Sequence, residues 1–435
     1  MLFYVINGDI QTLKRQIRYN PSRSFMSQTS IQRIENALWG TFIGDALAMP
    51  AHWFYSPRHL RKSFPEGIDR YYPAPHPHPD AFMLGMGYEP DVGNASAAGR
   101  PYDILHQHGR FYRTSYSDFG FDLDHRDSEH GNATAALDKR THYHHGLEAG
   151  ESTLGAALVR VLMRSVIDRG GYSQDGFLED FVRYMTQPRD NRDPYTEIYL
   201  RRWFEHYSQG VAPENCAEHQ RRVWSIGSMG GLIRPLVLAL LNPDNSFLAT
   251  GMALGHQQLT HRSELVGSGL SLLVPTLLQL VNGASSQILF RELLRQLPAP
   301  AVSGEALFQT YRDHDGPGNI PADETWRLHM AFLDENADKR KADYFATACY
   351  IEQALPLIAA LGHQHQGDLS AALRANAEAG GDNVHRGMVL GLLLGAGATD
   401  IPDHWKAGLK DHSELAKEIR QFAAIASRGH AHLTL

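Results

Sequence analysis

Nine residues near the C-terminal end of the chain, MVLGLLLGA at positions 388–396, include no polar side chain. A helix formed by this segment must be buried on every side, because it has no polar face to present to water. The chain is long enough to surround it, with 435 residues of which 43% are hydrophobic. Directly before the segment stand Asp382, Asn383, His385 and Arg386. Polar groups carried into an interior need partners, so these residues call for a structural or functional explanation.

Apolar spacing typical of helices recurs along the rest of the chain. We expect helices over 31–48, 152–168, 232–241, 263–280, 344–362 and 368–378. Because no convincing run of alternating strand residues accompanies them, the sequence predicts an all-α fold. The apolar segment 265–281 is interrupted by Gly, Ser and Pro, and we interpret it as a core helix rather than a membrane span.

The segment 57–140 differs in composition from these helical segments. It is dense in Pro, Gly, His and Tyr and cannot sustain regular helix, although it has room for a hairpin near 110–116. Loops of this length in compact domains are functional or disordered, and the many aromatic residues favour an ordered lid. We therefore expect an N-terminal extension over 1–30 and a single helical domain over 31–435 that contains this loop-rich insertion.

Charge and cysteine content exclude several classes of protein. The chain has 41 Lys and Arg against 48 Asp and Glu, a formal net charge of −7, and no long basic run, so nucleic-acid binding is not indicated. Cys216 and Cys349 stand far apart and outside any C-x-x-C motif, which favours a reducing compartment. Without a secretory signal we expect a cytoplasmic protein, although the Arg- and Ser-containing segment 10–33 also loosely fits an organelle transit peptide.

Two polar positions interrupt or precede predicted helices. Asp45 lies in an apolar helix that ends near Pro50 and is followed by His52. This carboxylate either caps a neighbouring helix or lies at the floor of a polar cavity, since a buried carboxylate must find partners. Thr260 and His261 precede another helix, where a satisfied helix start is the simpler interpretation.

A third polar group combines histidines with a helix start. His142, His144 and His145 precede the helix expected from position 152, and Glu151 and Thr153 lie at its N-terminus. Imidazole and carboxylate groups suit transition-metal binding or acid and base catalysis. Histidines on loops are also common at the surface, and helix capping alone explains a Glu and a Thr at this position.

The polar start of the apolar C-terminal helix forms the fourth group. Asp382 and His385 are three residues apart and share one helix face, so they can supply two ligands of one metal ion, or an acid and its orienting partner. They equally fit a capping Asp that is hydrogen-bonded to a His. Gly380 and Gly381 let the backbone turn tightly and approach a ligand. The residues alone therefore indicate a helical protein with a polar centre suited to metal binding.

Three motifs resemble the ADP-ribosylglycohydrolases, all-helical hydrolases related to the dinitrogen reductase-activating glycohydrolase. GTFIGDALAMP at 40–50 is similar to the family's first-helix motif, and LTH at 259–261 is similar to its central Thr-His. ANAEAGGDN at 375–383, with GMVLGLLLGAGA at 387–398, resembles its Gly-Gly-Asp turn and final glycine-rich helix. The resemblance implies an all-helical single domain, cleavage of ADP-ribose from modified side chains, and a two-magnesium centre.

The family's metal motifs are altered in this chain. His52 stands where the family usually has Glu, and GEST at 150–153 keeps one carboxylate, Glu151, of the family's Thr-Asp-Asp-Thr. In the Gly-Gly-Asp turn the first Asp is kept as Asp382, whereas Val384 replaces the second. This set is too poor in oxygen ligands for a magnesium pair. We expect at most one strongly bound divalent metal, magnesium by resemblance, with candidate ligands Glu151, Asp382, Asn383 and His385.

The resemblance implies a hydrolase that cleaves an N- or O-glycosidic bond of an ADP-ribosyl or related ribosyl substrate. The carboxyl groups of Asp45, Glu151 and Asp382 are expected to converge on one cavity. The alternative is a catalytically degenerate protein that binds ADP-ribose or a nucleotide, or that has kept only the fold. The expected partner is a small-molecule or ADP-ribosylated substrate, with no nucleic acid and no membrane. The candidate catalytic residues are Asp45, His52, Glu151 and Asp382, and the candidate substrate-binding residues are His144, His145, Thr153, Gly381 and Arg386.

Overall fold

The computed structural model describes residues 27–80, 87–106, 142–188, 191–297, 345 and 347–428. Residues 1–26 of the predicted extension, the predicted hairpin near 110–116 and part of the predicted lid lie outside the described residues. The longer helices are α2 (Gln28–Ala48), α7 (Leu154–Arg169), α8 (Gln174–Thr186), α9 (Ile198–Ser208), α10 (Gly230–Ala239), α11 (Ser246–Gln258), α12 (Glu264–Val281), α13 (Ser286–Gln296), α16 (Ile351–Gln364), α17 (Leu369–Ala379), α18 (Asn383–Gly397) and α20 (His412–Ala426). The shorter ones are η1 (Met49–Ala51), α3 (Pro57–Ser63), α4 (Val92–Ala97), η5 (Pro213–Asn215), η6 (Trp224–Gly227) and α19 (Asp403–Ala407).

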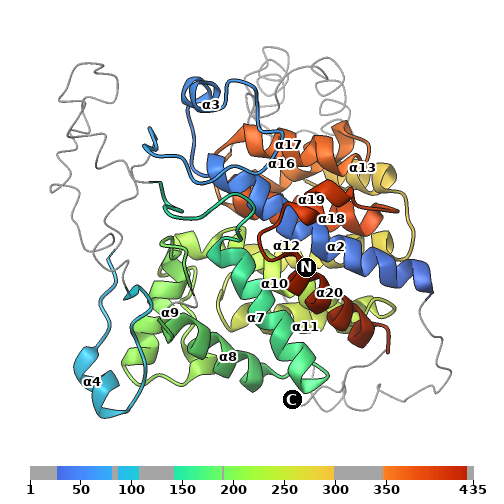
Figure 1. Cartoon of the computed structure of the whole chain (residues 1–435). Helices are drawn as coiled ribbons and strands as arrows, with labels where there is room; N and C mark the ends of the chain where they lie inside the picture. Colours follow the sequence, from blue (N-terminus) through green and yellow to red (C-terminus); the bar gives the residue numbers. More distant parts are fainter. Residues whose placement is uncertain are drawn as a thin grey trace, which may run out of the picture.

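The all-α prediction is confirmed (Figure 1). In the described part of the chain the β-structure consists of two isolated bridges, His219 with Arg262 and Ser228 with Tyr350. The predicted helices match α2, α7, α10, α12, α16 and α17, with two corrections. The expectation that 57–140 sustains no regular helix is wrong for the short helices α3 and α4, whose starts are capped by Ser56 and Asp91. The helix expected from position 344 begins only at Ile351, because the preceding backbone makes tertiary hydrogen bonds, including one in which Met229 N donates to Cys349 O.

Helices α2 and α18 lie side by side near the middle of the molecule (Figure 1). Glycines let their backbones touch: a Cβ on Gly40 would lie 2.0 Å from Gly391 O, and one on Gly391 would lie 2.0 Å from Gly40 O. Gly44 and Gly387 repeat this relationship one turn away. The close approach explains the glycine-rich sequence of α18, and it brings the C-terminal end of α2 to the N-terminal end of α18.

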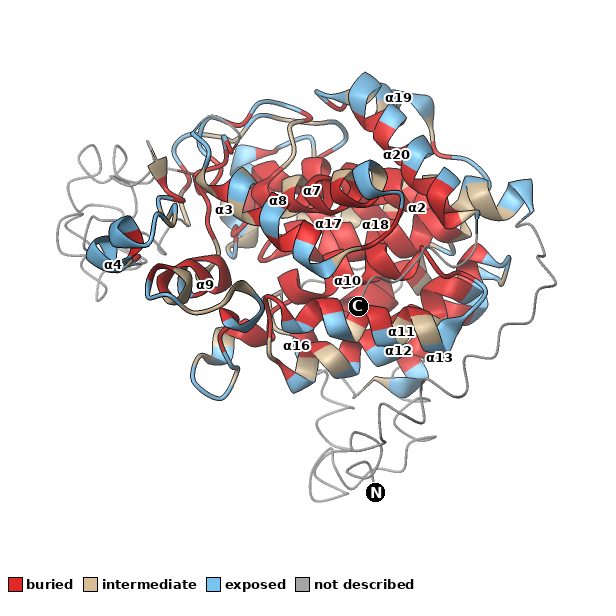
Figure 2. Ribbon diagram, turned by 90° about the horizontal axis from the view of Figure 1, so that it is seen from below, coloured by how far each residue is buried: buried red, intermediate tan, exposed pale blue. Residues whose placement is uncertain are grey.

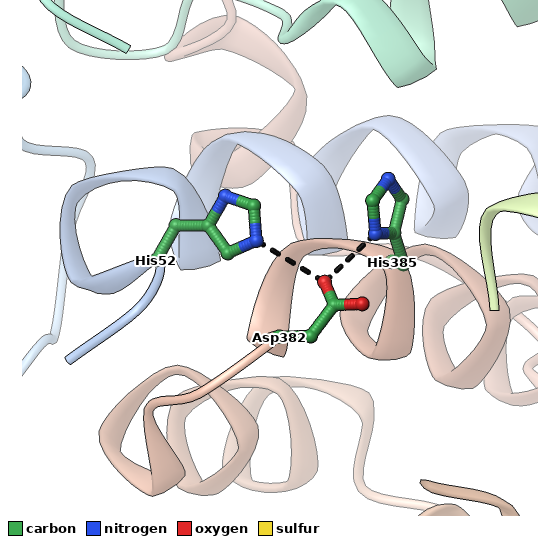
Figure 3. Close-up of side chains that lie close together, drawn as sticks. All are labelled: His52, Asp382 and His385. Atoms are coloured by element: carbon green, nitrogen blue, oxygen red, sulfur yellow. Dashed lines mark hydrogen bonds and ion pairs between the residues drawn. The ribbon is translucent and has the colours of Figure 1, made fainter. Parts of the chain in front are cut away.

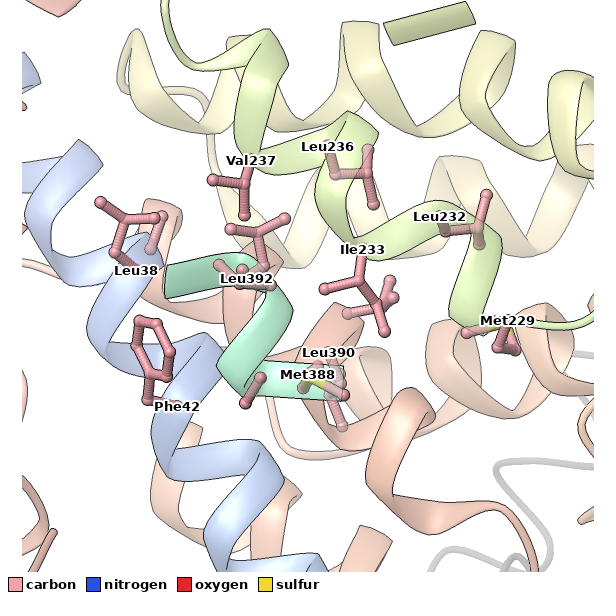
Figure 4. Close-up of a cluster of buried hydrophobic side chains, with 14 of the residues drawn as sticks. Leu38, Phe42, Met229, Leu232, Ile233, Leu236, Val237, Met388, Leu390 and Leu392 are labelled. Carbon is pink, nitrogen blue, oxygen red and sulfur yellow. The ribbon is translucent and has the colours of Figure 1, made fainter. Parts of the chain in front are cut away.

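The hydrophobic core surrounds this helix pair (Figure 2). Leu38 and Phe42 of α2, Ile233 and Val237 of α10, and Leu392 of α18 lie close together in Figure 4 and are at most 3% exposed. Of the residues in α18, all from Asn383 to Ala396 are buried. The prediction that residues 388–396 form a helix buried on every side is therefore confirmed.

Helix α12 is long and apolar enough to cross a membrane by length and composition alone. Over half of it, 56%, is buried inside the protein, and a core helix of a soluble protein passes the same test. It packs against α10, α11 and α18. These contacts favour the core-helix interpretation made from its sequence.

Candidate active site

A double-glycine turn brings two remote segments into contact. Gly380 and Gly381 have positive φ values of 68° and 63°, and Gly381 N donates a hydrogen bond to Phe54 O at 2.8 Å. A Cβ on Gly380 would lie 2.1 Å from Phe54 O, so a side chain there would clash. The two glycines thus permit close approach to the protein's own backbone. This pairing places His52, just after η1, beside Asp382, the N-cap residue of α18.

The carboxylate of Asp382 lies between two imidazole rings (Figure 3). Its Oδ1 atom is 2.7 Å from Nδ1 of His385 and 3.1 Å from Nε2 of His52. The other ring nitrogen of His385, Nε2, lies 3.2 Å from Oε1 of Glu197, which directly precedes α9. The side chain of Asp382 therefore serves its neighbouring histidines and makes no capping hydrogen bond at the start of α18.

The same row of contacts continues on the far side of His52. Its Nδ1 atom lies 2.6 Å from Nε2 of His144, and Nδ1 of His144 lies 2.8 Å from Oδ1 of Asp193. The side chain of Glu197 is 13% exposed, whereas the other members of the row are at most 5% exposed. We call this row the histidine–carboxylate chain; in order, its members are Asp193, His144, His52, Asp382, His385 and Glu197.

Aromatic side chains contact His52 and His144 of the histidine–carboxylate chain. Trp53 stacks on His52 with ring centroids 4.7 Å apart, and Tyr195 contacts His144 edge-on at 5.6 Å. Trp53, Tyr143 and Tyr195 form a small buried cluster of their own. Trp53 also has a φ of 65°, a costly conformation for a residue with a side chain. Such strain is typical of functional sites, where the surrounding structure holds it in place.

Burial and mutual contacts set the charges of the chain. Burial alone would lower the pKa of His385, but the carboxylates of Asp382 and Glu197 raise it well above its usual value. Burial alone would raise the pKa of Asp382, but the charge of His385 and its hydrogen bond hold it below its usual value. Burial lowers the pKa of His52 to about 3. At neutral pH His385 is therefore cationic, Asp382 anionic and His52 neutral.

The N-terminus of α7 contacts the histidine–carboxylate chain at Asp193. It also binds a second carboxylate, that of Asp45. Asp193 Oδ2 accepts a hydrogen bond from Leu154 N at 2.7 Å. Asp45 accepts from Thr153 N at 2.9 Å and from Thr153 Oγ1 at 2.6 Å. Burial raises the pKa of Asp45 to about 6, partly offset by the hydrogen bonds from Thr153. Asp45 and Thr153 thus lie next to the chain and bind each other at this helix start.

Glu151 and His145 lie apart from the chain. Glu151 forms ion pairs with Arg192 at 2.8 Å and Lys410 at 3.3 Å, and it accepts a hydrogen bond from Glu148 N. His145 is exposed. Three carboxyl groups were expected to converge. Asp45 contacts the start of α7 and Asp382 lies at the start of α18, and the histidine–carboxylate chain connects these two helix starts. Glu151 is instead paired with basic side chains.

The remaining predicted residues on α18 make structural contacts. Arg386 is fully buried and donates to Asn376 Oδ1 and Gly380 O, each at 2.7 Å. Asn383 donates to Ala377 O at 3.0 Å, although its Oδ1 atom is buried without a hydrogen-bond partner. These contacts fix the turn between α17 and α18, which in turn orients Asp382.

Two members of the chain, Asp193 and Glu197, were not predicted from the sequence. They lie in the stretch NRDPYTE at 191–197, between α8 and α9. The available signal is a pair of acidic residues beside Pro194 directly before a helix. Acidic residues are common in such positions as simple caps, so the pattern does not distinguish these two from others.

Two cavities in the described part of the molecule are not lined by members of the histidine–carboxylate chain, although Ile198, which follows Glu197, lines the first of them. One of about 290 Å³ is lined by residues that include Glu89, Arg201 and Glu205, and one of about 490 Å³ is lined by residues that include Ser285 and Asp368. Within the chain itself, Glu197 is the most exposed member. Solvent therefore reaches the histidine–carboxylate chain most directly at Glu197.

The donor atoms of the chain do not suit the magnesium pair that the family resemblance implies. His52, Asp382 and His385 have ligand atoms within 4.8 Å of one another, close enough to hold one metal ion. Two of the three ligands are nitrogens, whereas magnesium prefers oxygen. Val384 is buried and carries no donor, and Glu151 is bound elsewhere. The residues fit one metal ion, and they do not fit two magnesium ions.

Comparison with known proteins gives one family and one fold. The family model described as ADP-ribosylglycohydrolase matches residues 26–432. A solved structure described as an ADP-ribosylglycohydrolase-related protein complex is similar at a TM-score of 0.50 and 15% identity, covering 92% of this chain and 100% of that one. This likeness concerns the fold alone. No curated protein matches the sequence significantly.

Proposed function

We propose that this chain, which belongs to the ADP-ribosylglycohydrolase family, hydrolyses an N- or O-glycosidic bond between ADP-ribose and a side chain or small molecule. One observation carries the proposal: His52, two residues after the motif at 40–50, and Asp382, in the motif at 375–383, meet at 3.1 Å. In this reaction water adds to the anomeric carbon, the bond to the leaving nitrogen or oxygen breaks, and a proton passes to the leaving group. The sugar passes through an oxocarbenium-like state.

Asp382 is the residue that stabilises this cationic state. Its pKa is held below the usual range by His385, so its carboxylate is ionised at neutral pH. Its Oδ2 atom is buried and has no hydrogen-bond partner. A carboxylate with one free oxygen in a water-poor site interacts strongly with positive charge that develops nearby. Asp382 therefore contributes most in the transition state, where that charge is greatest.

Glu197 supplies the proton transfers, and His385 positions it. Glu197 lies at the more exposed end of the chain and contacts Nε2 of His385 at 3.2 Å. It can accept a proton from the attacking water, while His385 holds its carboxylate in place. Glu197 then transfers this proton to the leaving group. His144 and Asp193 act indirectly, because they orient His52.

The experiment is a hydrolysis screen with N-linked and O-linked ADP-ribosylated peptides, in which released ADP-ribose is quantified by chromatography. Wild-type protein should release ADP-ribose from at least one linkage. His52→Gln should lower kcat by roughly 10- to 100-fold, because His52 helps to position the Asp382 carboxylate. His256→Gln is the matched control, because His256 is also a buried histidine but lies in α11, outside the chain.

The screen also tests the alternative that the fold binds its ligand without turnover. Binding of ADP-ribose by calorimetry together with no release from any linkage would support a binding protein and overturn the proposal. Equal hydrolysis by wild-type protein and His52→Gln would show that the reaction takes place at another site.

A further inference from the structure

We propose that His52, Asp382 and His385 bind a single zinc ion, in place of the magnesium pair that the family resemblance implies. The ligand atoms are Nε2 of His52, one carboxylate oxygen of Asp382 and Nδ1 of His385. This inference concerns metal binding and does not rest on which bond the protein cleaves.

The first argument is the direction of the hydrogen bonds at His52. The carboxylate of Asp193 can only accept, so Nδ1 of His144 donates to it, at 2.8 Å. In a neutral ring this leaves Nε2 of His144 as an acceptor, and Nδ1 of His52 must donate to it, at 2.6 Å. Nε2 of neutral His52 then presents a lone pair to Oδ1 of Asp382 at 3.1 Å. Two acceptors that face each other need a cation between them.

The same reasoning applies to His385. Glu197 accepts from Nε2 of His385, which leaves Nδ1 of a neutral ring as a lone pair 2.7 Å from Oδ1 of Asp382. Three lone-pair atoms thus converge on one point. Without metal, added protons must occupy these contacts. The extra proton that makes His385 cationic is one of those protons. One divalent ion satisfies all three atoms with both rings neutral.

The second argument is the support behind each histidine. A metal-binding His nearly always donates its other ring N–H to a carboxylate or carbonyl, which fixes the ring and makes it a better ligand. His385 has Glu197 in this position, and His52 has His144 backed by Asp193. The two rings lie at 89° to each other with centroids 5.9 Å apart, so they approach Asp382 from different directions.

The third argument is the choice of metal. Two imidazole nitrogens and one carboxylate oxygen are the protein ligands of several catalytic zinc sites, which keep a fourth position for water. Ligand atoms about 2.1 Å from a tetrahedral ion lie roughly 3.3 Å apart. The oxygen–nitrogen separations of 2.7 Å and 3.1 Å are somewhat shorter than this value, and all three ligand atoms lie within 4.8 Å of one another, so side-chain adjustment can bring them around one ion. Magnesium requires near-octahedral oxygen coordination, which this set cannot supply.

The experiment measures metal binding directly. Chelator-treated protein is dialysed against Zn²⁺, or against Co²⁺ as a spectroscopic substitute, and metal content per chain is determined. We expect one ion per chain, a Co²⁺ absorption spectrum typical of low coordination number, and no displacement by millimolar Mg²⁺. His52→Gln and His385→Gln should abolish this binding. Glu197→Gln, which leaves all three ligands in place, should weaken it by roughly 10- to 100-fold.

His256→Gln is the control and should bind Co²⁺ like wild-type protein. Circular dichroism establishes which variants are folded, and Glu197→Gln keeps the test informative if a ligand variant does not fold. Folded wild-type protein that binds no Co²⁺ would overturn the proposal, because protons alone would then fill the site. Binding of two Mg²⁺ ions, or Co²⁺ binding that His52→Gln, His385→Gln and Glu197→Gln leave unchanged, would overturn it as well.

Discussion

Nε2 of His144 lies 2.6 Å from Nδ1 of His52, although the two residues are 92 positions apart in the sequence. This contact joins the two halves of the histidine–carboxylate chain. Asp193 contacts the other ring nitrogen of His144, and Asp382 contacts the other ring nitrogen of His52. A residue such as Asp193 can therefore influence the reacting end of the chain without touching substrate. Its role is to position His144 and, through it, His52.

Asp193→Asn tests this positioning role. An Asn can still accept from Leu154 N, but it cannot hold His144 with a full negative charge. We expect kcat to fall by roughly 10- to 100-fold with little change in KM, the size of effect known for residues that support a reacting histidine. The measurement is steady-state hydrolysis of the linkage found in the screen.

Asp180→Asn is the matched control for Asp193→Asn. Asp180 is also a buried carboxylate, paired with Arg169 and Arg183 in α7 and α8. Its replacement should lower the melting temperature and leave kcat unchanged. If both variants lost stability while both kept kcat, Asp193 would be a structural residue only.

Gly391→Ala tests the contact between α2 and α18. The added Cβ would lie 2.0 Å from Gly40 O, and backbone at this position has little room to move. We expect the free energy of unfolding to fall by about 3 kcal/mol or more, as in severe overpacking. Urea unfolding followed by circular dichroism gives this value.

Gly251→Ala serves as the comparison. Gly251 lies in α11 with no atom within 4 Å of the added Cβ, so alanine should stabilise the protein by about 0.5–1 kcal/mol. Similar effects of the two substitutions would contradict the direct backbone contact between α2 and α18.

Buried neutral histidines should make the protein sensitive to acid. Burial lowers the pKa of His142, His256 and His261 well below 6.5. Below pH 6.5 the unfolded chain therefore binds protons that the folded chain excludes, and the free energy of unfolding falls as the pH decreases. Each excluded proton contributes about 1.4 kcal/mol per pH unit. Asp45 acts in the opposite direction below about pH 6, where its raised pKa lets the folded state bind a proton.

Urea unfolding between about pH 7 and pH 5 measures this effect. We expect stability to decrease across the range, because the buried neutral histidines, which include His52, outnumber Asp45 and His385, the groups that bind extra protons in the folded state. His256→Gln should reduce the slope, since it removes one of the groups. A free energy of unfolding that is constant over this range would contradict a net exclusion of protons by the folded protein.

Local sequence patterns predicted seven of the longer helices, because apolar spacing is a property of neighbouring residues, but they missed α8, α9, α11, α13 and α20. The burial of residues 388–396 in α18 followed from their lack of polar side chains, and the glycines of α18 fit directly against α2. The start of α16 was wrong because tertiary hydrogen bonds from other segments hold the residues before Ile351. Such contacts leave no local pattern.

The candidate site was predictable only in part for the same reason. The proximity of His52 and Asp382, 330 positions apart, was expected from the family resemblance rather than from spacing. Glu151 occupies the position of a family carboxylate, but Arg192 and Lys410 draw its side chain away. Asp193 and Glu197 enter the chain through contacts with His144 and His385, which only the folded arrangement reveals.

Hydrolysis by Asp382→Asn tests most directly the claim that the histidine–carboxylate chain is the centre of catalysis. We expect kcat to fall by at least roughly 10²-fold, with helical content and ADP-ribose binding retained, and Asp382→Glu to restore part of the activity. A folded Asp382→Asn variant that releases ADP-ribose at the wild-type rate would contradict the claim.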